Sequence, residues 1–228
     1  MKRRVIAIVL VLALMMTTTV FASDASESRS TTLPEQAIKN YDLLFAGKGE
    51  VYDSFGNVIT QQFIVENISL YSSGNYDAIR QSCYNMNVSR IHVHESNIVQ
   101  PSSRAFLEIE YEDTITHYIT QPEPPFEGKE WEINVTAHGT YIYQDSYQYI
   151  YNFPEPWISY SFWGEGALFS AYVTENRITT PRLNSDKSAA SFTVETYHCV
   201  DGPVPGLDTV TYTLGPFYTE SDFVIEGL

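Results

Sequence analysis

RAFLEIEYEDTITHYIT (Arg104–Thr120) and KEWEINVTAHGTYIY (Lys129–Tyr143) are the two stretches that decide the fold of this chain. In both, apolar residues such as Ile109 and Ile133 alternate with polar ones such as Glu110. Successive side chains of a strand point to opposite faces, so each stretch predicts a strand with one apolar and one largely acidic face. The intervening QPEPPFEG predicts a stiff, exposed turn. We therefore expect a long hairpin with one face in water.

Segments of similar composition lie on both sides of this hairpin. They are rich in Val, Ile, Thr, Tyr and Phe and are separated by turn clusters, which predicts further strands. These are expected at residues 50–54, 58–71, 88–99, 147–153, 157–163, 167–174, 190–200 and 207–214. With the hairpin they make about ten short strands without a sequence repeat. This indicates an all-β fold, an antiparallel β-sandwich of immunoglobulin-like or jelly-roll type.

A helix is expected in front of the strands, over residues 32–47. Thr32 and Glu35 have the spacing of a capping box, and Gly47 suits a helix end. The apolar residues of one helical face are Ala37, Ile38, Tyr41, Leu44 and Phe45. Residues 75–84 could form a second short helix. The sequence thus predicts one sandwich domain over residues 32–228, preceded by a short helix.

The first 22 residues have the pattern of a secretory signal peptide. A basic start, Lys2 to Arg4, is followed by an apolar run, Val5–Met16, and by the cleavage-like end at Ala22. The apolar run is too short to span a bilayer, and residues 23–31 read as a disordered leader. Because no apolar tail, sorting sequence or lipobox cysteine follows, we expect a secreted, extracellular protein without membrane insertion.

The charge of the chain restricts its partners. Cleavage after Ala22 would remove three of the 13 basic residues and change the net charge from −15 to −18. Such an acidic protein repels nucleic acids and anionic membrane surfaces. Extracellular glycans and basic proteins remain as partners, and a solubility role for the charge remains open. The oligomeric state cannot be derived from the sequence.

Cys83 and Cys199 are the two cysteines of the chain. The secretory route permits a disulfide between them, which would close a loop of just over a hundred residues. Two buried free thiols are the alternative. No CxxC spacing indicates redox or zinc chemistry.

Three histidines form the pattern in the sequence that most resembles a metal-binding site. His92 and His94 are spaced to lie on one face of a strand, and His117 follows later. This spacing is similar to that of the zinc-binding histidines of α-class carbonic anhydrases, although only these three residues carry the resemblance. Alternation places His117 with apolar Ile115 and Ile119, and so on the side opposite the other two. We therefore expect no metal site, and histidines on a solvated face.

Carboxylates cluster on the acidic side of the hairpin. Glu108, Glu110 and Glu112 follow one another at period two, with Glu130 and Glu132 possible neighbours on the second strand. Paired carboxylates perform acid–base chemistry in glycosidases when burial raises one pKa. A secreted hydrolase using Glu108, Glu110, Glu130 and Glu132 is thus one hypothesis. A solvated acidic face is the simpler interpretation, and no DxDxDG loop indicates calcium.

An aromatic stretch over residues 141–163 favours binding. Tyr and Trp rings on a sheet surface stack on sugar faces, whereas the same residues also fill β cores. No catalytic or cofactor motif is present. We therefore predict a non-catalytic module without a cofactor that recognises a glycan or a cell surface. The expected ligand-binding residues are Tyr147, Tyr149, Trp157 and Trp163.

Overall fold

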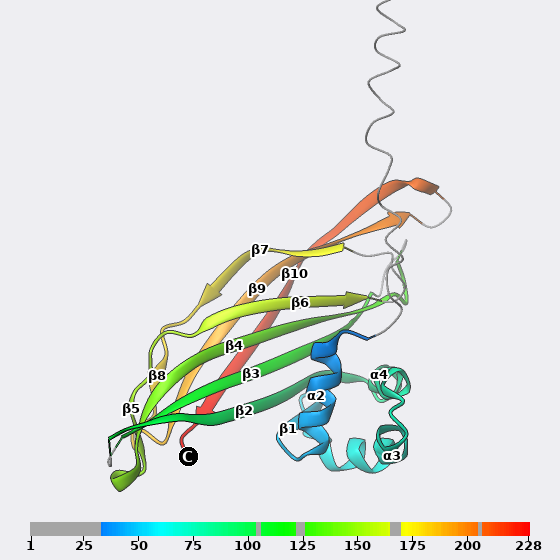
Figure 1. Ribbon diagram of the computed structural model, residues 1–228. Coiled ribbons are helices and arrows are strands. Elements are labelled where there is room, and N and C mark those ends of the chain that lie inside the picture. Colours follow the sequence, from blue (N-terminus) through cyan, green and yellow to red (C-terminus); the bar gives the residue numbers. More distant parts are fainter. Residues whose placement is uncertain (1–32, 104–105, 122–125, 165–169, 205–206) are drawn as a thin grey trace, which may run out of the picture. The chain divides into compact units, whose positions relative to one another are not determined.

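A computed structural model describes residues 33–103, 106–121, 126–164, 170–204 and 207–228 (Figure 1). These residues form two antiparallel sheets packed face to face and three α-helices, of which the first precedes all the strands. This confirms the predicted sandwich with an N-terminal helix. The proposed signal peptide and leader, residues 1–31, lie outside the described residues.

The first sheet, sheet A, contains the hairpin that decided the fold. Its strands are β1 (Gly49–Asp53), β2 (Val88–Ser103), β3 (Phe106–Thr120), β4 (Glu130–Gln144), β5 (Tyr149–Asn152) and β6 (Trp157–Gly164). They are ordered β1-β2-β3-β4, and β4 pairs with both β5 and β6. The hairpin register runs without a bulge from Thr120↔Glu130 to Leu107↔Tyr143.

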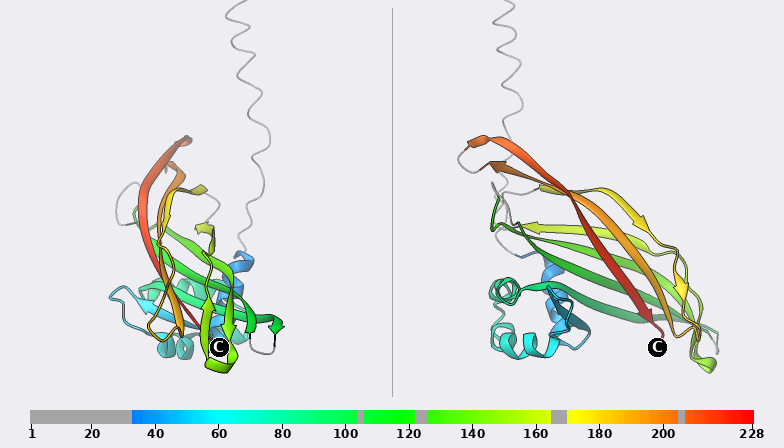
Figure 2. Two further views of the ribbon diagram at one scale, coloured as in Figure 1. Left: turned by 90° about the vertical axis from the view of Figure 1, so that its left-hand side faces the viewer. Right: turned by 180° about the vertical axis from the view of Figure 1, so that it is seen from behind.

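The second sheet, sheet B, has four strands. They are β7 (Ser170–Ile178), β8 (Arg182–Leu183), β9 (Ala189–Val204) and β10 (Leu207–Glu226), with the central β9 pairing with the other three. In Figure 1 sheet A lies between the first helix in front and β9 and β10 behind, and the reverse view in Figure 2 shows the opposite order.

The main core lies between the two sheets. Because side chains alternate along the strands, the apolar face of the hairpin packs against the inner face of sheet B. Ile133 and Val135 of β4 are buried together with Phe192 of β9 and Phe223 of β10. The apolar half of the predicted hairpin pattern is therefore the sandwich interior.

A second core lies on the other face of sheet A, beneath the helices. The helices are α2 (Glu35–Phe45), α3 (Thr60–Ser72) and α4 (Tyr76–Asn85), and a 3₁₀ turn, η1 (Asp145–Tyr147), follows β4. Tyr41, Leu44, Phe63 and Ile79 pack with Ile91 and other residues of β1 and β2. No helix of the described part is long and apolar enough to cross a membrane.

Two local expectations about the helices need correction. Residues 58–71, predicted as a strand, form α3 instead, because Phe63 and Asn67 lie one helical turn apart and are both buried. Tertiary packing here overrides the β propensity of Ile and Val residues. The first helix begins at Glu35, and its N-cap Pro34 provides no side-chain cap, so the capping box is not formed. Helix α4 confirms the second helix that residues 75–84 suggested.

The disulfide is not formed: Cys83 and Cys199 are buried free thiols. Cys83 belongs to α4 in the core beneath the helices, and Cys199 of β9 pairs with Tyr172 of β7, on the outer face of sheet B. Two sheet layers spaced about 10 Å apart separate these positions, whereas a disulfide needs Cα atoms within about 7 Å. Burial raises the pKa of Cys83 to about 12, which keeps it a thiol.

Candidate functional site

The outer face of sheet A carries a row of four functional side chains, one on each of four adjacent strands. Glu95 of β2 pairs with Glu112 of β3, which pairs with His138 of β4, which pairs with Trp157 of β6. Directly paired residues of an antiparallel sheet project to the same face. The register therefore brings together residues that are up to 62 positions apart in the sequence.

A second row lies beside the first, nearer the turn that leads to β5. Asn97, Glu110 and Thr140 are paired in the same way across β2, β3 and β4. A groove of about 540 Å³ covers both rows. We call it the Trp157 groove. This volume lies within the range of small-ligand sites.

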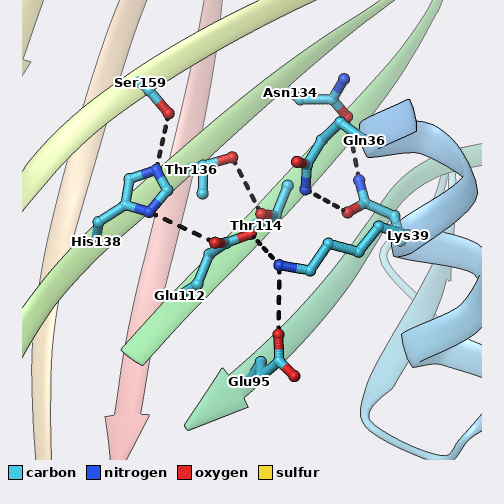
Figure 3. Close-up of polar contacts among 10 residues, drawn as sticks. Gln36, Lys39, Glu95, Glu112, Thr114, Asn134, Thr136, His138 and Ser159 are labelled. Atoms are coloured by element: carbon cyan, nitrogen blue, oxygen red, sulfur yellow. Dashed lines mark hydrogen bonds and ion pairs between the residues drawn. The ribbon is translucent and has the colours of Figure 1, made fainter. Parts of the chain in front are cut away.

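Helix α2 closes one end of the groove with a lysine. The Nζ of Lys39 lies 2.8 Å from Oε1 of Glu112 and 3.3 Å from Oε2 of Glu95 (Figure 3). Like charges directly opposite each other in a sheet repel, and this ammonium compensates for both. Burial alone would lower the pKa of Lys39, but its hydrogen bonds and charge contacts with the two carboxylates raise it above its usual value.

Glu112 is held in its ionised form by the same contacts. Burial alone would raise its pKa, but the hydrogen bond and the charge of Lys39, together with His138, outweigh this effect and lower the pKa. His138 lies 3.7 Å from Glu112 through Nδ1, and its Nε2 is hydrogen-bonded to Ser159 at 2.9 Å (Figure 3). Burial lowers the pKa of His138, which favours the neutral imidazole.

Trp157 provides the aromatic surface of the groove. Its ring centroid lies 4.7 Å from that of His138, and 66% of the residue remains exposed. The imidazole thus supports one part of the indole, while most of the ring surface stays accessible. An exposed indole beside carboxylate and amide groups can stack on an apolar ring face while these groups accept hydrogen bonds.

A buried polar network fixes α2 beside the groove. Nδ2 of Asn40 donates to Oγ1 of Thr116 at 3.0 Å, and Thr116 donates to Asn134 at 2.6 Å. Asn134 in turn donates to Ser161 at 3.0 Å, and Gln36 donates to Asn40 at 3.0 Å. The expectation that this face of the hairpin lies in water is therefore wrong for its central part, because α2 covers it.

The carboxylates of the hydrolase hypothesis do not lie side by side. Glu108 pairs with Ile142 and Glu130 with Thr120, so the two pairs of glutamates occupy opposite ends of the hairpin. Glu132 is 1% exposed and forms an ion pair with Arg80 of α4. Burial raises the pKa of Glu132 to about 7, against the opposing effect of Arg80. Its role in the structure is to pair with this helix.

The four aromatic residues predicted to bind a ligand occupy three different places. Tyr147 and Tyr149 lie together at η1, with ring centroids 6.1 Å apart. Trp163 lies at the far end of β6, where Arg80 stacks on its ring at 3.5 Å. Six residues separate it from Trp157, about 20 Å along a strand. Of the four, only Trp157 lines the groove.

The three histidines share one face of sheet A, contrary to the expectation. His117 pairs with Arg90, which alternates onto the same face as His92 and His94. This face is turned toward sheet B, where His117 is hydrogen-bonded to Ser221 at 2.8 Å. His94 is exposed, but His92 is only partly so. Within the described ranges, no group of three or more His, Cys, Asp or Glu residues is arranged to hold a metal ion.

A larger cleft of about 680 Å³ opens between the inner face of β1 and β2 and the edge of β10. Several of its polar groups are paired with one another. Tyr52 donates to Glu50 and lies 4.4 Å beneath the guanidinium of Arg90, and His92 is paired with Asp113. Glu95 and Glu112 line both this cleft and the Trp157 groove, but the exposed indole of Trp157 lies in the groove alone.

The sequence alone did not identify Lys39, Glu95 and His138 as parts of one site. The turn between the hairpin strands aligns Thr120 with Glu130, and this register alone would have aligned Glu112 with His138. The contribution of α2 has no comparable local signal. No protein-family model matches the chain, and the comparisons with curated proteins and with solved structures give no match either.

Proposed function

We propose that this protein is a secreted, non-catalytic module that binds carbohydrate in the Trp157 groove. The observation that carries the proposal is the exposed indole of Trp157 in one row with polar side chains on four adjacent strands. Sugar rings have an apolar face that stacks on aromatic rings and hydroxyl groups that donate to carboxylates and amides. Secretion is inferred from the signal-peptide pattern of residues 1–22.

The groove is built on a rigid support, which favours binding. Its residues project from paired strands rather than from loops, and the Asn40–Thr116–Asn134 network holds α2 against the same sheet. Preorganised sites lose less conformational entropy when they bind. A weak contact such as ring stacking then contributes more of its energy to affinity.

The hydrolase alternative has less support in the described residues. Lys39 bonds both Glu95 and Glu112, and it lowers the pKa of Glu112, which makes this carboxyl a poor general acid. Glu132 has the raised pKa of an acid catalyst, but its 1% exposure gives a substrate no access. We therefore favour binding without catalysis.

Titration of the protein with a panel of neutral and charged oligosaccharides tests the proposal. We expect at least one to bind and to change the tryptophan fluorescence, and we expect Trp157→Ala to abolish this binding. Tyr147→Ala is the matched control, because Tyr147 is exposed but lies outside the groove. Equal loss of binding in both variants, or no binding by the unaltered protein, would contradict the proposal.

A further inference from the structure

The charges in the Trp157 groove indicate which carbohydrate it takes. Three carboxylates line it, those of Glu95, Glu110 and Glu112. Lys39 bonds the first and the last. Glu110 is exposed, and no ion pair involving it is found in the part of the chain that the structure describes. The groove therefore retains negative charge after its internal ion pairs are formed.

We propose that the ligand of this groove is a cationic carbohydrate, an amino-sugar chain with free ammonium groups. This inference rests on the proposed function and specifies its substrate class. An ammonium group matches the uncompensated carboxylate of Glu110, and the apolar face of a sugar ring matches the indole of Trp157. The indole also attracts cations, so both ends of the groove favour the same ligand.

Lys39 provides an example, within the protein itself, of an ammonium group bound by the carboxylates of the groove. Its ammonium lies between two carboxylates of the groove at 2.8 and 3.3 Å. Glu110 is the next outward-facing residue of β3 after Glu112, so a ligand ammonium there would extend this arrangement along the strand. The net charge of −15 over the whole chain attracts cations at long range and disfavours anionic polysaccharides.

The layout of the groove favours a ligand of more than one sugar ring. Glu110 lies on β3 and Trp157 on β6, with β4 between them. Two strand spacings separate these residues by about 10 Å. This backbone spacing is larger than one pyranose ring and favours a ligand of more than one sugar. We therefore expect affinity to rise from the monomer to short oligomers.

The test compares three tetrasaccharides of equal length: a glucosamine tetramer, its fully N-acetylated form, and a neutral glucose tetramer. Calorimetric titration at pH 5.5 keeps the sugar amines protonated. We expect the glucosamine tetramer to bind about tenfold more tightly than the other two, as for one charge-assisted hydrogen bond. This advantage should shrink in 0.5 M salt.

Two glutamates of β3 provide a matched pair of variants. Glu110→Gln should lower the affinity for the glucosamine tetramer about tenfold. It should leave the affinities for the two neutral tetramers unchanged. Glu108→Gln is the control, because Glu108 lies on the same face of β3 but does not line the groove. Trp157→Ala should abolish the binding of all three tetramers.

The outcomes separate this inference from the proposed function. Equal affinities for the three tetramers, all lost in Trp157→Ala, would overturn the cationic ligand and leave carbohydrate binding intact. No binding of any oligosaccharide would overturn both. A further outcome is that polylysine binds in a way that depends on Glu110 and Trp157 while the glucosamine tetramer does not bind. This result would overturn a sugar as the ligand and indicate a basic peptide instead.

Discussion

The ammonium of Lys39 donates to the carboxylate of Glu112 over 2.8 Å and so joins helix α2 to the central hairpin. The two residues are separated by 73 positions in the sequence. The same ammonium reaches Glu95 on β2, so one cation connects α2 to two strands and defines one end of the groove. Lys39 therefore contributes both to the stability of this region and to its charge balance.

Lys39→Met should destabilise the protein most clearly at neutral pH. The contact is partly exposed to solvent, so we expect a loss of only about 0.5–1 kcal/mol in the free energy of unfolding. The pKa of Glu112 is lowered in the folded state, so its stabilising contribution is present above the unfolded pKa and is lost as the pH falls through the folded pKa. Urea unfolding at pH 7 and pH 3 should show a larger loss at pH 7 than at pH 3.

The double variant Lys39→Met/Glu112→Gln provides the control for this prediction. Removing one of the two opposed carboxylates should restore part of the lost stability, because Glu95 then faces a neutral amide. A double variant that is less stable than Lys39→Met would contradict the role of Lys39 as the compensating charge.

Arg80→Met should be far more damaging than Lys39→Met, because it leaves the buried Glu132 without its partner. We expect a loss of about 3–5 kcal/mol. Burial already raises the pKa of Glu132 to about 7, so the folded state favours its protonated form and stability falls as the pH rises from the unfolded pKa to about 7. The variant should thus be weakest at pH 8 and recover at pH 5.

Urea unfolding at these two pH values measures the effect. Arg177→Met is the matched control, because Arg177 pairs with Glu175 on the exposed face of sheet B, where an ion pair contributes little to stability. A loss in Arg80→Met that does not change between pH 5 and pH 8 would argue against an uncompensated carboxylate as its cause.

The two cysteines should react with thiol reagents only after unfolding. Cys83 and Cys199 are both buried, and burial raises the pKa of Cys83, so little reactive thiolate is present in the folded protein. We expect no reaction with a disulfide reagent under native conditions and two thiols per chain in denaturant. A melting temperature that falls on addition of reductant would instead indicate a disulfide.

Period-two alternation predicted the sandwich because the inward and outward faces of β3 and β4 follow directly from it. It did not predict which polar residues are buried. Thr116 and Asn134 read as solvated, yet Asn40 of α2 reaches them over 76 and 94 positions of sequence. Such burial depends on where a distant helix packs, and no local pattern encodes this.

The sequence also did not show which residues of neighbouring strands lie on the same face of the sheet. Assigning His117 and His92 to opposite faces assumed that the apolar residues of both strands face one core, whereas Ile91 packs beneath the helices and Ile115 packs between the sheets. The sequence does not specify the register between β2 and β3 either. A shift of one residue in pairing exchanges the two faces. The row of paired groove residues that begins with Glu95 depends on the register between β2 and β3, so the sequence did not predict it.

His198→Leu should flatten the pH dependence of stability. His198 of β9 is fully buried between Phe162 and Phe217, and neither ring nitrogen has a hydrogen-bond partner among the described residues. Burial lowers its pKa to about 4, so between pH 6.5 and pH 4 the unfolded state binds more protons and stability falls as the pH falls. The resulting loss in the free energy of unfolding between these pH values is up to about 3 kcal/mol.

At pH 7 the leucine variant should be at least as stable as the unaltered protein, because it removes two unpaired polar atoms from the core. At pH 4.5 it should be clearly more stable. His117 has a similarly lowered pKa and leaves a residual slope in the variant, whereas His94→Leu alters an exposed imidazole and serves as the control. Parallel stability curves for His198→Leu and the unaltered protein between pH 4 and pH 7 would show that His198 is not the group that titrates on unfolding.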